Sequence, residues 1–375
     1  MDNPAGRALP LPISWEECRL RGWSHLDILL VTGDAYIDHP SFGVALIGRL
    51  LESHGYRVAI LPQPRFDSAE DFKAFPTPRL FCGITAGNLD SIVANYTGNG
   101  KVRDTDAYSP NGNPWRGKER LKTSRRRPDR ATLLYTSLAR SAFREIPIVL
   151  GGIEASLRRF VHYDFKQAKL RSSFLTDAKA DLLVYGMGEK AIVEIARRCA
   201  EKMPLSFIGG TCQRYTDRDL REQFPALGPD RFDELEVKSS QKFLVLPSWE
   251  KIQAEQHYFL EAETEIDRHA RACSPRIVLQ HQQSHWVVQH PAPRPLSPRE
   301  LDALYSLPYT RRPHPENQEI PAFRMIRDSV TIVRGCSGNC SFCAITRHQG
   351  PAIVSRSRES IGVECRRIAQ AFRPL

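Results

Sequence analysis

The stretch Asp27-Ile-Leu-Leu-Val-Thr-Gly33 is a short, continuous apolar run that ends in a glycine. Runs of this kind are typical of strands that are buried on both faces of a parallel sheet. Helical periodicity follows such runs, most clearly over 189–202, where Ile192, Ile195 and Cys199 share one face. Four further apolar runs have the same character: Arg57–Leu61, Leu80–Thr85, Pro147–Leu150 and Asp181–Tyr185. Strands that alternate with helices predict an α/β fold with a doubly wound, Rossmann-like N-terminal domain.

Glycine-containing turns follow four of these predicted strands. Ligands of open α/β sheets bind beyond the carboxyl ends of the strands, where glycine lets a ligand approach the backbone. Glycine is equally common in turns that bind nothing, so both interpretations stay open. The four turns are Gly33-Asp34, Thr85-Ala-Gly-Asn88, Gly151-Gly-Ile-Glu154 and Gly186-Met-Gly-Glu189.

Cysteines dominate the run Arg334-Gly-Cys-Ser-Gly-Asn-Cys-Ser-Phe-Cys-Ala-Ile-Thr346. Cys336, Cys340 and Cys343 have C-x3-C-x2-C spacing, which supplies three thiolates to an iron–sulfur cube and leaves the fourth iron without a protein ligand. Zinc is the alternative, but zinc sites usually combine two C-x2-C-like pairs, and only Cys340 and Cys343 form one here. His348 is the nearest candidate for a fourth zinc ligand. The spacing favours an iron–sulfur cluster.

The segments that flank the cysteines predict where they lie in the fold. Residues 328–334 are rich in β-branched side chains and predict a strand, and residues 358–372 have helical periodicity. A loop between a strand and the following helix is where β/α barrels place their chemistry. Phe342, directly before the last cysteine, offers an aromatic face to a ligand bound there.

The C-x3-C-x2-C run with an aromatic residue before its last cysteine resembles the cluster-binding motif of radical S-adenosylmethionine (SAM) enzymes. The resemblance implies that Cys336, Cys340 and Cys343 ligate a [4Fe-4S] cluster and that Phe342 flanks the adenosyl group of SAM. It also implies an external electron donor and reductive cleavage of SAM to a 5′-deoxyadenosyl radical, with the substrate left open.

The chain as a whole resembles the YgiQ family of radical SAM proteins. Some of the same segments are also similar to the Rossmann-like domain of cobalamin-binding radical SAM enzymes, which makes cobalamin a further candidate cofactor. The lower-axial histidine of such domains comes from D-x-H-x-x-G, and Asp38-His39-Pro-Ser-Phe-Gly43 has those residue types at a different spacing. The segments that carry the likeness include Val31–Tyr36, Arg127–Arg130, Gly151–Arg159, Val184–Glu189 and Leu307–His314.

The resemblance divides the chain into a Rossmann-like domain over 1–240, a connecting segment rich in Pro and His over 241–322, and the start of a radical SAM core over 323–375. That core holds one βα unit of a (β/α) barrel, whereas each unit of such a barrel takes roughly 25–30 residues. We therefore expect a truncated chain whose barrel is completed by a second polypeptide. The alternative is a non-catalytic binding or interaction module with a zinc or vestigial cysteine site.

Composition, charge and targeting signals predict where the protein is located and which partners it has. With 375 residues and 41% hydrophobic content the chain buries a sizeable core, and its nine cysteines are too scattered for a disulfide framework. The sequence shows neither a signal peptide nor a membrane span, which predicts a cytoplasmic protein without a membrane partner. The net charge is +10, and residues 98–130 are rich in Lys and Arg with Tyr96, Tyr108 and Trp115 nearby. This segment fits a weak nucleic-acid contact or a solvated loop.

Overall fold

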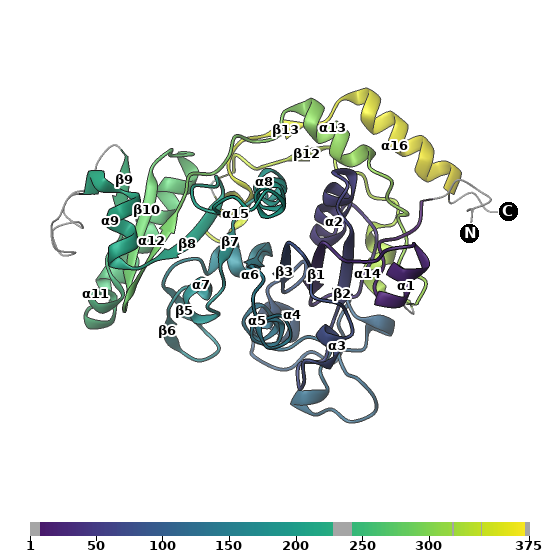
Figure 1. The fold of residues 1–375 in the computed structure, drawn as a ribbon, viewed down its shortest axis with the longest axis horizontal. Coiled ribbons are helices and arrows are strands. Elements are labelled where there is room, and N and C mark those ends of the chain that lie inside the picture. The colour runs from purple at the N-terminus through teal and green to yellow at the C-terminus, as the bar shows by residue number, and fades with distance from the viewer. Residues whose placement is uncertain (1–7, 228–241, 317–318, 339, 372–375) are drawn as a thin grey trace. The chain divides into compact units, whose positions relative to one another are not determined.

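The computed structural model describes residues 8–227, 242–316, 319–338 and 340–371 (Figure 1). The chain forms two compact units. Unit 1 contains Met1–Ile146, Arg294–Gly335 and Ala352–Leu375, and unit 2 contains Pro147–Pro293 and Cys336–Pro351. Each unit combines segments that are distant in sequence. The division predicted at residues 240 and 322 stays a prediction.

Unit 1 contains the parallel strands predicted from the apolar runs. Strand β1 (Ile28–Thr32) pairs in parallel with β2 (Val58–Pro62) on one side and β3 (Phe81–Thr85) on the other. All of β1 is buried, which explains its unbroken apolar sequence. Helix α2 (Gly43–Ser53) packs on β1 and β2, and α5 (Ala131–Ala142) packs on β3. These contacts confirm the α/β class for this part of the chain.

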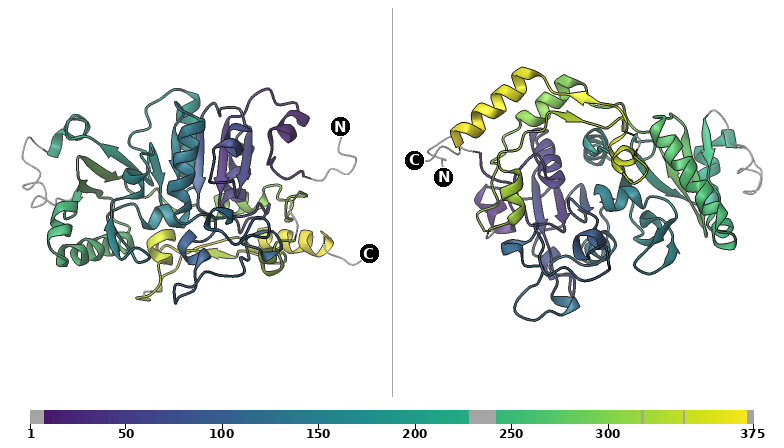
Figure 2. Two further views of the ribbon diagram at one scale, coloured as in Figure 1. Left: turned by 90° about the horizontal axis from the view of Figure 1, so that it is seen from below. Right: turned by 180° about the vertical axis from the view of Figure 1, so that it is seen from behind.

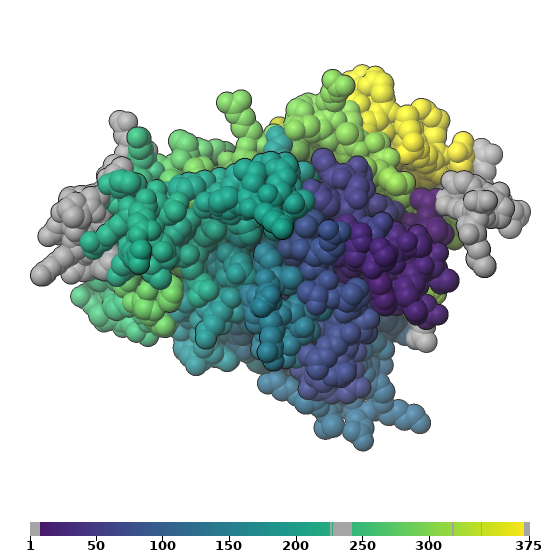
Figure 3. All heavy atoms as spheres, viewed as in Figure 1, coloured from purple at the N-terminus to yellow at the C-terminus, as the bar shows by residue number. Residues whose placement is uncertain are grey.

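Short helices and the C-terminal segment complete unit 1. Helix α16 lies beside α13 at the surface, where both are visible in Figures 2 and 3. Its inward side chains are Glu364 and Ile368, whereas Cys365, which was predicted to share the apolar face, is exposed. The remaining elements are α1 (Trp15–Leu20), α3 (Glu70–Lys73), α4 (Ser91–Asn95), η1 (Pro110–Gly112), η2 (Lys122–Ser124), α13 (Pro298–Ser306), α14 (Pro321–Ile326), β12 (Val333–Arg334), β13 (Val354–Ser355) and α16 (Arg358–Ala371).

Unit 2 has a mixed sheet in the strand order β4-β7-β8-β11-β10-β9. The pairs β4–β7 and β9–β10 are parallel, and the three pairs between them are antiparallel. The predicted parallel sheet is therefore extended here by antiparallel strands. The strands are β4 (Ile148–Leu150), β7 (Leu182–Val184), β8 (Thr211–Tyr215), β9 (Phe243–Val245), β10 (Ile277–Gln282) and β11 (His285–Gln289).

The first half of the predicted connecting segment contributes three strands to this sheet. Strands β9, β10 and β11 all lie between residues 243 and 289, and Trp286 of β11 is almost fully buried among apolar neighbours. Strands β10 and β11 are joined through Gln283 and Ser284, and Gln283 has a φ of 60°. A turn without glycine gives little hairpin signal in sequence, which explains why the pairing was not predicted.

The helices of unit 2 surround its sheet. Helix α8 confirms the predicted helix that begins at Glu189, and two further helices, α11 and α12, lie in the predicted connecting segment. Among the described residues, none of the helices is both long and apolar enough to cross a membrane. The other elements of unit 2 are β5 (His162–Asp164), β6 (Lys169–Arg171), α6 (Gly152–Leu157), α7 (Phe174–Asp177), α8 (Glu189–Ala200), α9 (Asp217–Gln223), η3 (Pro225–Leu227), α11 (Trp249–Ala254), α12 (His257–Arg271) and α15 (Ile345–Gln349).

The strand predicted before the cysteines is shorter than expected. The structure has β12 over Val333–Arg334 only, and its partner is the antiparallel β13 rather than a parallel barrel strand. A strand extends only as far as a neighbour satisfies its backbone groups, and β13 is itself two residues long. The order of strand, cysteine loop and helix is as predicted, with β13 and α15 inserted before α16.

Candidate functional site

Two of the three cysteine sulfurs lie close to Gly338, a glycine within the loop. A Cβ atom placed on Gly338 would lie 3.2 Å from Sγ of Cys336 and 4.0 Å from Sγ of Cys340. A side chain at this position would therefore occupy the space that two of the sulfurs face. All three cysteines are unpaired thiols, and Cys340 is exposed while Cys336 and Cys343 are partly so. Accessible thiols around a cleared space fit a loop that wraps a metal group.

The spacing of the sulfurs separates a cluster from a single metal ion. One tetrahedral zinc holds its sulfur ligands about 3.8 Å apart, as follows from Zn–S bonds of about 2.3 Å. In the described part of the chain, the ligand atoms of only Glu17, His314 and Glu316 form a group of three within 4.8 Å of one another. At least two of the three sulfurs therefore lie more than 4.8 Å apart. A cubane differs from zinc in that each thiolate binds a different iron.

His348, the candidate fourth zinc ligand, has a different role. It lies on α15 with its Nδ1 atom 3.0 Å from the hydroxyl oxygen of Ser156 on α6. Burial, with a smaller contribution from the nearby Arg159 guanidinium, lowers the pKa of His348 to about 4. The contact between Nδ1 of this half-buried side chain and Ser156 fits a packing role.

Hydrogen bonds within the loop fix its path. The backbone N–H of Cys343 donates to the carbonyl oxygen of Cys340 at 3.1 Å. The buried hydroxyl of Thr346 lies 3.2 Å from the carbonyl oxygen of Cys336 and 3.3 Å from that of Gly338. Thr346 is on α15, so this short helix is tied back to the segment that carries the first cysteine.

Arg271 is a cation on α12, in the same unit as the cysteine loop. Its pKa is raised, first by its hydrogen bond to Asp267 and less by charge at Cys340 and Cys343. Positive charge near a bound cluster lowers the net negative charge there. Arg271 lies 65 or more positions before the cysteines in sequence, and no local motif marks it. Sequence analysis missed it for that reason.

Phe342 is 91% exposed and has no packing role in the loop. Its predicted contact with an adenosyl group stays a prediction, although an exposed ring next to Cys343 is available for one. Other exposed apolar side chains are Ile345 in unit 2 and, in unit 1, Met325, Ile332, Val333, Ile353 and Val363.

The glycines that follow β1 and β3 approach protein atoms instead of leaving room for a ligand. A Cβ atom on Gly33 would lie 2.2 Å from the carbonyl oxygen of Ala86, and one on Gly87 would lie 2.3 Å from the carboxylate of Asp34. Gly87 also has a φ of 112°, which side chains rarely adopt. Close packing within unit 1 therefore explains both glycines.

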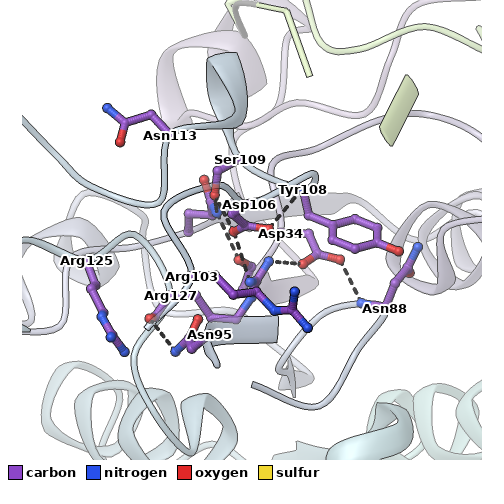
Figure 4. A network of polar contacts seen from close by, with 12 residues as sticks. Asp34, Asn88, Asn95, Arg103, Asp106, Tyr108, Ser109, Asn113, Arg125 and Arg127 are labelled. Atoms are coloured by element: carbon purple, nitrogen blue, oxygen red, sulfur yellow. Dashed lines mark hydrogen bonds and ion pairs between the residues drawn. The ribbon is translucent and has the colours of Figure 1, made fainter. Parts of the chain in front are cut away.

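A buried ion-pair network fills the same edge of the unit 1 sheet (Figure 4). Arg127 donates to Asp34 at 2.5 Å and to Asp106 at 2.9 Å, and all three side chains are at most 5% exposed. Ser109 donates to Asp106 at 2.6 Å, and the backbone N–H of Asn88 donates to Asp34 at 2.7 Å. Burial raises the pKa of Asp34, and the Arg127 guanidinium opposes that rise.

The arginines of the predicted nucleic-acid segment are largely structural. Arg125 forms an ion pair with Asp129 at 3.1 Å and lies over the rings of Tyr96 and Trp115, which were predicted to stack on bases. Arg127 is the centre of the network described above. The basic residues that remain exposed are Lys101, Arg103, Lys118, Arg120 and Lys122. A nucleic-acid contact stays a prediction for these residues alone.

His39 does not fit a cobalt ligand. Its side chain is fully buried, its Nδ1 accepts the backbone N–H of Ser41 at 3.1 Å, and burial lowers its pKa to about 3. An axial histidine must present a ring nitrogen to an open face wide enough for a corrin, whereas Nε2 of His39 is enclosed by protein. His39 therefore does not supply a lower-axial ligand, and cobalamin bound without a protein ligand stays a prediction.

Glu17, His314 and Glu316 converge in unit 1, and sequence analysis did not identify them. Nε2 of His314 lies 3.2 Å from Glu17, and its Nδ1 accepts the backbone N–H of Glu316 at 3.4 Å. These contacts satisfy both ring nitrogens without a metal ion. His290, in the Pro- and His-rich segment, is buried near aromatic rings.

An α/β chain with a C-x3-C-x2-C loop between a strand and a helix has the features of a radical SAM protein. The comparison with protein families agrees, because the Radical SAM N-terminal family matches residues 10–329. This chain belongs to the Radical SAM N-terminal family, and its curated relatives are UPF0313 proteins of the YgiQ type.

Two relatives illustrate the extent of the match. A UPF0313 protein of Rhodopseudomonas palustris is 45% identical over 367 residues, which cover 96% of this chain and 52% of the relative. A UPF0313 protein of Geobacter sulfurreducens is also 45% identical, with 96% of this chain and 55% of the relative covered. The chain thus spans about half the length of the curated relatives it matches.

Among solved structures, the chain is similar to the radical SAM methyltransferase TsrM of Kitasatospora setae. The TM-score is 0.48 at 15% identity, and the match covers 92% of this chain and 45% of TsrM. TsrM has been solved with tryptophan and a SAM analogue, and also with cobalamin and a [4Fe-4S] cluster.

Proposed function

We propose that this chain is the N-terminal part of a radical SAM enzyme whose [4Fe-4S] cluster is held by Cys336, Cys340 and Cys343. The accessible sulfurs of Cys336 and Cys340, which both lie close to Gly338, support this proposal most directly. The C-x3-C-x2-C spacing, with only one C-x2-C pair, favours a cluster with one thiolate for each of three irons over zinc.

The residues around the loop have separate roles in this proposal. Gly338 keeps the space open, Thr346 holds the backbone at Cys336, and Arg271 supplies positive charge beside Cys340 and Cys343. Phe342 is available to contact the adenosyl group of SAM. When bound, the cluster supplies the electron that cleaves SAM to methionine and a 5′-deoxyadenosyl radical, and an external donor replaces that electron.

Further βα units would cover exposed apolar side chains of unit 1. Ile332 and Val333 precede the cysteines and are exposed, and Ile353 and Val363 follow them and are also exposed. In a complete barrel, strands on both sides of the first one would bury such side chains. We propose that these units come from a further length of the same polypeptide, as the longer relatives suggest, or from a second polypeptide.

Anaerobic reconstitution tests the cluster. We expect about four irons and four sulfides per chain and a brown absorbance near 400 nm, as [4Fe-4S] proteins show. A triple variant, Cys336→Ala, Cys340→Ala and Cys343→Ala, is expected to lose this signal. The matched control is Cys365→Ala, which removes an exposed thiol from α16 and is expected to leave the iron content unchanged.

The same preparation separates the alternative functions. Deoxyadenosine that forms from SAM under reduction supports an enzyme. Zinc bound in place of iron, with no brown colour after reconstitution, would contradict the proposal and favour a non-catalytic module. The localisation in the cytoplasm, predicted from the sequence, fits a cluster that needs reducing surroundings.

A further inference from the structure

The cysteine loop packs as part of unit 2. Residues Cys336–Pro351 belong to the same compact unit as Pro147–Pro293, although the strand and helix on either side of the loop belong to unit 1. The contacts that join the loop to unit 2 are made by α15, which starts two residues after Cys343. Helix α15 packs on α6 and on α12.

An ion pair joins α15 to α12. Arg347 donates to the carboxylate of Glu263 at 2.5 Å, and both side chains are less than one-third exposed. Glu263 lies in the middle of α12, two helical turns before Arg271. A partly buried arginine–carboxylate pair fixes geometry better than an exposed pair, because solvent competes less for both groups.

A second contact joins α15 to α6 and to the turn after β7. The buried hydroxyl of Ser156 lies 3.0 Å from Nδ1 of His348, and it accepts the backbone N–H of Gly186 at 3.2 Å. A Cβ atom on Gly186 would lie 3.0 Å from the carbonyl oxygen of His348, and Gly186 has a φ of 71°. Glycine at this turn thus lets α15 approach the end of β7 closely.

Thr346 continues this connection to the cysteines. Its hydroxyl contacts the carbonyl oxygens of Cys336 and Gly338, and it stands directly before Arg347 and His348 in α15. A path of side-chain contacts therefore runs from α12 and α6 through one short helix to the backbone that carries the first sulfur. A helix of five residues is too short to be stable alone, so its position depends on these contacts.

We propose that unit 2 is the platform that positions the cluster loop, and that Glu263 and Ser156 are its positioning residues. The proposal rests on the proposed function, because it concerns the same three cysteines. It gives the glycine-containing end of β7 a specific occupant, which is the helix that follows the proposed cluster ligands. Partners of this kind outside the ligand set typically change metal affinity by about 10-fold to 100-fold when they are removed.

A charge-swap series tests the platform. Glu263→Gln and Arg347→Gln each remove the ion pair, and Glu263→Arg combined with Arg347→Glu restores it in reverse. The matched control is Glu261→Gln, which changes an exposed carboxylate on the same helix. We expect iron loss to a chelator to be about tenfold faster in each single variant, and close to the unchanged protein in the swap and in the control.

Two further measurements report on the loop apart from activity. The electron paramagnetic resonance spectrum of the reduced cluster should change in Glu263→Gln and recover in the swap, which a general loss of stability would not produce. In the cluster-free protein, hydrogen exchange over residues 340–351 should be faster in Glu263→Gln and in Ser156→Ala than in Glu261→Gln. This measurement keeps the test valid if a variant fails to take up iron.

The outcomes separate the two proposals. If the unchanged protein binds no cluster, the proposed function fails, and the hydrogen-exchange comparison still decides whether unit 2 holds the loop. If the unchanged protein binds a cluster and Glu263→Gln matches Glu261→Gln in iron loss, spectrum and exchange, the platform is overturned and the proposed function stands. Failure of the charge swap to restore either signal would also count against the platform.

Discussion

The carboxyl end of β1 in unit 1 and that of β7 in unit 2 present similar sequences but different surroundings. After β1, Gly33 and Asp34 pack against other residues of unit 1, and Arg127 neutralises the buried carboxylate. After β7, Gly186 approaches the helix that follows the three cysteines. One edge is closed by an internal ion-pair network, and the other contacts the helix of the cysteine loop. Gly33 and Gly186 thus both allow close packing, but with different partners.

The largest expected effect is at the closed edge. Arg127→Gln leaves Asp34 and Asp106 buried without a cation, so we expect the free energy of unfolding to fall by about 3–5 kcal/mol. Urea unfolding followed by circular dichroism measures this loss. The control is Arg120→Gln, which removes an exposed ion pair with Asp104 and should cost less than about 1 kcal/mol. Equal losses in the two variants would mean that the network does not hold this edge together.

A pair of glycine substitutions compares the two edges directly. Gly87→Ala places a methyl group against the Asp34 carboxylate at a φ of 112°, so we expect a loss of about 2–4 kcal/mol. Gly151, after β4, has extended backbone angles and nothing within 4 Å of a Cβ atom. Gly151→Ala should change the stability by less than about 1 kcal/mol. If Gly87→Ala leaves the free energy of unfolding unchanged, the space between Gly87 and Asp34 is larger than the 2.3 Å from a Cβ atom to the Asp34 carboxylate indicates.

His39, a buried histidine of unit 1, predicts a loss of stability in acid. The pKa of His39 is lowered to about 3, whereas the unfolded chain takes up a proton at about 6.5. Stability is therefore complete above pH 6.5 and falls as the pH drops towards 3, with a contribution from His39 of about 2 kcal/mol lost by pH 5. Urea unfolding at pH 7 and at pH 5 measures this effect. Between these two pH values, the free energy of unfolding should fall by about 2 kcal/mol less in His39→Asn than in the unchanged protein. An unchanged acid loss would place the responsible group elsewhere.

The smallest expected effect is at the edge that contacts the helix of the cysteine loop. Ser156→Ala removes one neutral hydroxyl that His348 and Gly186 share, which should lower the unfolding free energy by about 1–2 kcal/mol. The control, Thr264→Ala, removes an exposed hydroxyl on α12 that bonds within its own helix and should cost less than about 0.5 kcal/mol. A loss in Ser156→Ala as large as that in Arg127→Gln would remove the contrast between the two edges.

Local sequence patterns were sufficient for the parallel strands, the helix at Glu189 and the cysteine loop. The apolar runs at Ile28, Val58 and Phe81 became strands because each is buried on both faces. Contacts between distant residues were not predictable. Arg127 reaches Asp34 across 93 positions and Arg347 reaches Glu263 across 84, so no periodicity or spacing relates them.

The contacts of the basic segment over 98–130 were also not predictable from sequence. A run of arginines with aromatic residues nearby looks identical in sequence whether the rings stack on bases or on the arginines themselves. The structure shows the second arrangement, with Arg125 over Tyr96 and Trp115. Net charge and composition describe the whole chain, whereas the free charge on a surface depends on which cations have found an internal partner.

The electron paramagnetic resonance spectrum of the reduced, reconstituted protein, recorded with and without SAM, tests the central claim most directly. Three thiolates on a four-iron cluster leave one iron free to bind SAM, so we expect the spectrum to change when SAM is added. The change should be absent after addition of S-adenosyl compounds that lack the amino acid carboxylate. A cluster spectrum that SAM leaves unaltered, or no cluster spectrum at all, would contradict the account.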